Sequence, residues 1–122
     1  MANIFTIKID GKERDIKMSF GLLNTICKLV GDLDGATQLM IDQTLQQAVL
    51  VELLSDRDAK GKITGEVSLD EIDVDPSDVL DLLAWAGNQT LDFFLKGLER
   101  AKGLQDQHMP RVKALMPSPS GS

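Results

Sequence analysis

Residues 4–31 read IFTIKIDGKERDIKMSFGLLNTICKLVG, and this stretch decides the fold. Two short apolar-polar runs flank Asp10-Gly11, a dipeptide that favours the two-residue type I′ turn of a β-hairpin. That turn sets a register in which Phe5 lies opposite Ile16, and one face of the hairpin becomes apolar. Because a lone hairpin is only marginally stable in water, we expect this face to pack on helices.

Clear start signals predict a first and a last helix. Ser19 is a suitable N-cap for an amphipathic helix that ends at Gly31. Asp75 followed by Pro76 predicts the start of a last helix that runs to about Gln105. The apolar stripe of this last helix gathers Val79, Leu80, Leu82, Leu83, Ala86, Thr90, Phe93, Phe94, Leu98, Ala101 and Leu104.

A helical stretch between them is capped by Asp32 or Asp34 and runs to about Leu54. Its pattern near residues 41–43 allows a break into two helices. From Leu45 onward it is apolar around nearly its whole circumference, which is typical of a helix buried on all sides. We therefore expect either a central helix or a helix that another subunit covers.

These elements predict an α+β, mostly helical fold, in which an N-terminal β-hairpin packs on three to four α-helices. The polar segment 55–75 allows a second small hairpin. With 122 residues the chain has room for one domain, which we place at residues 1–106. Residues 107–122 end in the linker-like PSPSGS, which predicts a flexible C-terminal tail.

Composition excludes several classes of function. The chain has 19 acidic and 13 basic residues, a net charge of −6, one cysteine and one histidine. We therefore expect no nucleic-acid partner, no metal, no cofactor and no catalytic residues, so that the chain is not an enzyme. No segment reaches the ~18 apolar residues of a membrane-spanning helix, and we expect no membrane partner.

Residues 56–67 resemble the calcium loop of an EF-hand, because Asp56 and Asp58 stand at loop positions one and three. Lys60 and Val67 stand where the loop needs oxygen ligands at positions five and twelve. The pattern therefore favours an ordinary acidic loop over a calcium-responsive module.

Two features favour a protein partner. The all-round apolar helix needs more cover than one hairpin and two helices easily supply. Trp85 falls off the apolar stripe, either as an exposed binding anchor or because Gly87 breaks the helix and resets its register. The residues that we expect to bind a partner are Leu45, Val49, Leu53, Trp85, Phe93 and Phe94.

The order of these elements resembles a known family. It is similar to that of the tail assembly chaperones of long-tailed bacteriophages. The matching elements are a short strand, Asp-Gly-Lys, a second strand and an amphipathic helix that opens with Ser19-Phe20-Gly21-Leu22-Leu23. The best-matching stretch is TIKIDGKERDIKMSFGLLNTI, at residues 6–26. In layout the resemblance covers about residues 4–105.

The resemblance implies a non-enzymatic protein that binds the long, helical tape-measure protein and promotes assembly of the tail tube around it. A longer frameshifted product of such proteins recruits the tail tube protein. We expect the chain in the cytoplasm of the infected host, absent from the mature virion, and self-associated as a homo-oligomer. The alternative is a structural virion or head-tail joining subunit.

Overall fold

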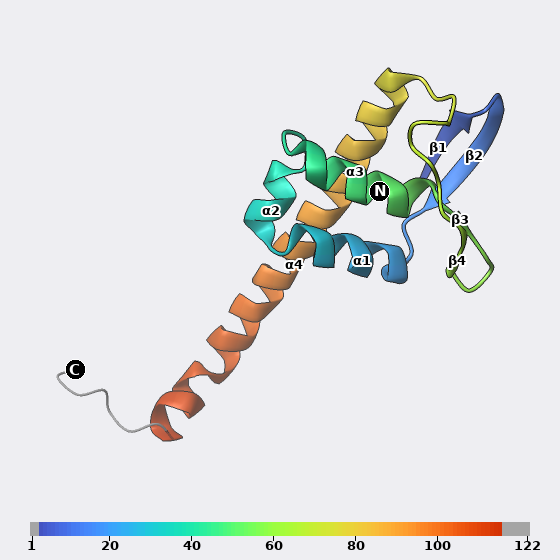
Figure 1. Cartoon of the computed structure of the whole chain (residues 1–122). Helices are drawn as coiled ribbons and strands as arrows, with labels where there is room; N and C mark the ends of the chain where they lie inside the picture. Colours follow the sequence, from blue (N-terminus) through green and yellow to red (C-terminus); the bar gives the residue numbers. More distant parts are fainter. Residues whose placement is uncertain (1–2, 116–122) are drawn as a thin grey trace.

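A computed structural model describes the backbone of residues 3–115 and the side chains of residues 3–107 (Figure 1). The fold in this part of the chain is α+β and mostly helical, as the sequence predicts: an N-terminal hairpin followed by four helices. The elements in chain order are β1 (Ile4–Ile9), β2 (Lys12–Lys17), α1 (Phe20–Val30), α2 (Leu33–Gln38), α3 (Gln43–Leu54), β3 (Asp56–Arg57), β4 (Ile63–Gly65) and α4 (Pro76–Leu115).

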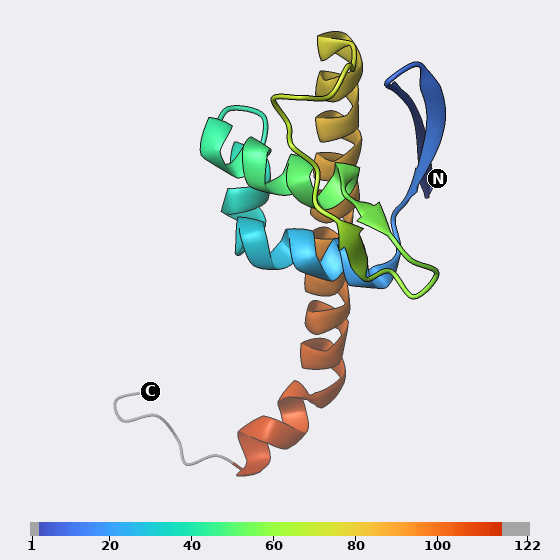
Figure 2. The ribbon, with the colours of Figure 1, turned by 45° about the vertical axis from the view of Figure 1, so that its right-hand side comes forward.

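The hairpin of β1 and β2 has the predicted register, with Phe5 opposite Ile16. Asp10 and Gly11 adopt φ angles of 52° and 80°, as both central positions of a type I′ turn require. Ile7 and Ile16 are buried in the core. The predicted apolar face therefore packs on the helices, on a different side of α4 from α1, α2 and α3 (Figure 2).

Side-chain caps set the helix boundaries. Ser19 caps α1, which ends at Gly31 with a φ of 85°. Asp32, rather than Asp34, caps α2, and Asp42 caps α3. The middle stretch is therefore two helices, one of the two arrangements that the sequence allows.

Helix α3 packs against both α1 and α4. Its buried side chains are Val49, Leu50, Leu53 and Leu54. They join one core cluster with residues of the hairpin and of the other helices, among them Ile26 and Leu82. The chain's own elements thus supply most of the cover that the apolar circumference of α3 requires.

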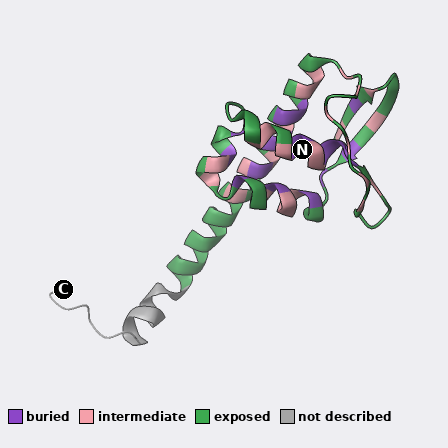
Figure 3. Ribbon diagram, viewed as in Figure 1, coloured by how far each residue is buried: buried purple, intermediate pink, exposed green. Residues whose placement is uncertain are grey.

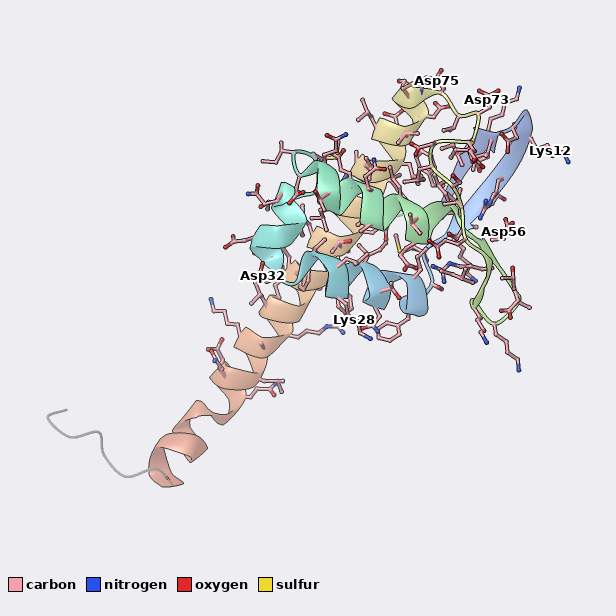
Figure 4. All side chains as sticks on the ribbon, viewed as in Figure 1. Lys12, Lys28, Asp32, Asp56, Asp73 and Asp75 are labelled. Atoms are coloured by element: carbon pink, nitrogen blue, oxygen red, sulfur yellow. The ribbon has the colours of Figure 1, made fainter. Side chains whose placement is uncertain are left out.

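A second, smaller hairpin is formed by β3 and β4. Residues 66–75 then lead back to α4 as a strap with one turn, in which Glu71 N donates to Ser68 O at 3.1 Å. Half-buried apolar side chains alternate along the strap with exposed polar ones. The strap is fixed to the first hairpin because Asp10 N donates to Asp73 O at 2.8 Å and Asp73 N donates to Asp10 Oδ1 at 2.9 Å. Its acidic residues, including Asp73 and Asp75, point outward (Figure 4).

Helix α4 begins at Pro76, as predicted, but continues to Leu115 instead of ending near Gln105. The backbone of residues 107–115, which the sequence analysis assigns to the C-terminal tail, is therefore helical; the flexibility of this tail stays a prediction. Most of these residues are good helix formers, although Pro110 removes one helical hydrogen bond and crowds the carbonyl four residues earlier. Residues 116–122, the rest of that predicted tail, lie outside the described residues.

The two halves of α4 have different surroundings. The first half packs against α1, α2, α3 and β1. From residue 95 to residue 107 every side chain is exposed, and the helix projects from the body (Figure 3). We call residues 95–115 the arm.

Candidate partner-binding surface

The apolar stripe of α4 continues beyond the point where other helices cover it. Within the body, its residues Leu82, Leu83, Ala86 and Thr90 are buried. Successive residues turn by about 100°, which places a further set on the same side of the helix. We call this set the exposed strip: Phe93, Phe94, Gly97, Leu98, Ala101 and Leu104.

The exposed strip leaves much apolar surface open to water. Phe93 is 44% exposed, and Leu98 and Leu104 are each 57% exposed. A helix in water is stabilised chiefly by burial of its apolar face against other elements. Residues 95–107 of the arm lack such cover from the described part of the chain, so the apolar side of this stretch is available to a partner.

A shallow apolar groove of about 430 Å³ borders the start of the exposed strip. One wall is the corner between α1 and α2, at Gly31, Asp32 and Leu33, and Figure 4 labels Asp32 at this corner. The other wall is α4, with Phe93, Phe94, Gly97 and Leu98. An apolar groove beside a helix suits the apolar face of a second amphipathic helix.

The predicted partner-binding residues divide between this groove and the core. Phe93 and Phe94 line the groove, with ring centroids 6.4 Å apart. Val49 and Leu53 are buried in the chain's own core and Leu45 is half-buried beside them. Partner binding by these residues stays a prediction, and a partner can reach Val49 or Leu53 only if the core opens.

Trp85, the sixth of these residues, is covered from another side. Helix α4 runs through Gly87 without a break, so a reset of the helix register is the wrong explanation for its off-stripe position. The indole is half-buried and packs on Phe5 of β1, with ring centroids 5.6 Å apart. The hairpin therefore covers the off-stripe side of α4 at this point.

Because Trp85 is the single tryptophan of the chain, its fluorescence reports on this contact. Phe5→Ala is expected to shift the emission maximum to longer wavelength, since water then reaches the indole. Ile4→Ala is the control, because Ile4 is adjacent in β1 and 49% exposed. Equal spectra for the two variants would contradict the packing of the hairpin on Trp85.

A polar hollow of about 610 Å³ lies between the two hairpins, but its arginines are bound within the chain. Arg14 donates to the carbonyl oxygens of Leu54 and Ser55 at 2.7 and 2.6 Å. Arg57 pairs with Glu52 at 2.7 Å. These bonds fasten α3 to both hairpins. The sequence analysis missed this role of Arg14, although its place opposite Ile7 on the apolar face of the hairpin indicated that its side chain faces the core.

The predicted acidic loop and the single cysteine have the following surroundings among the described residues. The Asp58 side chain accepts from the backbone of Lys60 and Lys62, and no group of three potential ligands gathers within the described range. Cys27 is half-buried, and this burial raises the pKa of its thiol, which makes it a poorer nucleophile at neutral pH.

No protein-family model matches the chain, and neither a curated protein nor a solved structure matches it. Across residues 3–115, no helix is both long and apolar enough to cross a bilayer. The exposed strip with its groove is therefore the candidate site on geometric grounds.

Proposed function

We propose that the chain is a tail assembly chaperone of a long-tailed bacteriophage and binds the tape-measure protein through the exposed strip. One observation carries the proposal: the stripe that forms the core in the first half of α4 continues to Leu104, and its residues from Phe93 onward are exposed except Phe94, which is half-buried against the core. Covering apolar surface gains roughly 25 cal/mol per Å². An exposed apolar helix face of this kind suits a long helical client with apolar stripes of its own.

In this proposal the work of the chain is binding, without catalysis. Apolar faces of the client lie along the exposed strip and in the groove at Leu33, and so are kept from aggregating. The acidic strap keeps the complex soluble in the host cytoplasm. The chain leaves before the tail is complete, and a frameshifted longer product recruits tube protein. When no client is bound, further copies of the chain can bind to the exposed strip.

Co-expression with the tape-measure protein tests the proposal. The wild-type chain is expected to raise the soluble fraction of the client and to co-purify with it. Leu98→Ser removes an apolar contact worth about 1.5–3 kcal/mol, which weakens binding roughly tenfold or more and lowers the rescue accordingly. Leu95→Ser is the matched control, because Leu95 is similarly exposed at 49% but lies off the strip.

Absence of both rescue and co-purification with the wild-type chain would rule out the proposal. Mass spectrometry of purified virions separates it from the alternative of a structural virion or head-tail joining subunit. A chaperone is expected to be missing from virions, whereas a structural subunit is present in fixed proportion to the other tail or head proteins.

A further inference from the structure

We infer that the exposed strip selects amphipathic helices whose apolar stripe is bordered by acidic residues. The inference rests on the proposed function, because it specifies the chemistry of the client segment that the same strip binds. Its basis is the distribution of charge along α4, which changes sign between the body and the arm.

The arm is basic although the chain is acidic. Residues 95–115 carry five basic and two acidic side chains, a net charge of +3. Residues 31–90, which make most of the body, carry thirteen acidic and three basic side chains, a net charge of −10. The arm is therefore a cationic extension of an anionic body.

Two of the arm's basic residues border the exposed strip. By helical geometry, Arg100 lies beside Phe93 and Leu104 at one edge of the exposed strip. Lys102 lies beside Leu98 at the other edge. Both are exposed, and neither pairs with an acidic side chain in the described part of the chain. A client helix on the strip would meet one free cation on each side.

The acidic residues near the strip are placed differently. Asp92, Glu99 and Asp106 lie on the opposite side of α4 by the same geometry, and Asp92 is already paired with Lys96 at 3.1 Å. Asp32, at the end of the groove, accepts from Gly35 N at 2.9 Å as the cap of α2. The borders along the strip are thus cationic, which favours Glu or Asp beside the client's stripe.

A cationic amphipathic helix can also bind an anionic membrane surface. The protein partner is favoured here for two reasons. The strip begins in a groove with a second wall at Leu33, which a flat membrane surface does not fill. The body carries a large negative charge, which such a membrane repels.

The test uses the full chain and two fluorescent helical peptides with the same leucine stripe, one bordered by Glu and the other by Lys. Anisotropy titrations at low salt are expected to show the Glu-bordered peptide binding about tenfold more tightly, a preference that falls at high salt. The double variant Arg100→Glu with Lys102→Glu is expected to reverse the order. Leu98→Ser is expected to weaken the binding of both peptides, whereas Leu95→Ser is expected to change the binding of neither.

Equal affinities for the two peptides would overturn the inference. Binding to phosphatidylglycerol vesicles but to neither peptide would also overturn it, in favour of a membrane. A double variant that changes only the oligomeric state of the chain would overturn it in favour of a second copy. If the chain rescues the tape-measure protein but binds both peptides equally, only the inferred preference for acid-bordered helices is refuted. If it prefers the Glu-bordered peptide but does not rescue the tape-measure protein, only the proposed function is refuted.

Discussion

Gly35→Ala is expected to destabilise the chain by at least about 3 kcal/mol. A Cβ at position 35 would overlap the backbone carbonyl oxygen of Val30 and lie 2.7 Å from its carbonyl carbon. Because these are backbone atoms, no side-chain rotation relieves the overlap, and the corner between α1 and α2 must open. Thermal unfolding followed by circular dichroism measures the loss.

Gly87→Ala is the matched control. Gly87 is buried in a helix, whereas Gly35 is half-buried in one, but a Cβ at position 87 would lie 3.6 Å from Leu39 Cδ2, an ordinary contact. Alanine is more favourable than glycine inside a helix by up to about 1 kcal/mol, so this variant is expected to melt at a higher temperature. If Gly35→Ala has the same melting temperature as the wild type, α2 does not approach the Val30 carbonyl as closely as described.

The corner that Gly35 permits also forms one wall of the groove, at Gly31, Asp32 and Leu33. A Gly35→Ala chain that remains folded is therefore expected to have a displaced groove. The stability of this corner and the shape of the candidate site depend on the same glycine.

Local signals made much of the fold predictable. The turn at Asp10-Gly11 fixed the register of the first hairpin, because both positions need positive φ. Ser19 and the Asp75-Pro76 pair marked helix starts, because the Ser19 and Asp75 side chains accept from backbone N–H groups of the first turn and Pro76 has no N–H to satisfy. These rules act over a few residues, so a single sequence contains what they need.

The candidate site depended on long-range packing, which the same patterns do not contain. The stripe of α4 is apolar from Val79 to Leu104, and no residue in it indicates where the other helices stop covering it. Likewise the apolar circumference of α3 predicted burial of Val49 and Leu53, but left open whether the chain itself or another subunit supplies the cover. Which apolar surface stays open follows from how the other helices cross α4.

Arg14→Ala is expected to lower the free energy of unfolding by about 2–3 kcal/mol. The Arg14 guanidinium donates to the carbonyl oxygens of Leu54 and Ser55 at the end of α3, and lies 3.5 Å from Asp56 Oδ1. Carbonyls in the last turn of a helix lack partners within the helix and attract cations. Losing this side chain leaves both carbonyls without their charged donor, and urea unfolding measures the cost.

Arg14→Lys and Lys17→Ala complete the experiment. Lysine keeps the charge but not the two-pronged geometry, so Arg14→Lys is expected to be intermediate. Lys17 lies on the same strand and is exposed, so its loss is expected to be nearly neutral. Because Ser55 Oγ also accepts from Val67 N at 3.1 Å, Arg14→Ala should speed amide exchange in the strap as well. Unchanged exchange there would show that the hairpin and the strap are held to α3 independently.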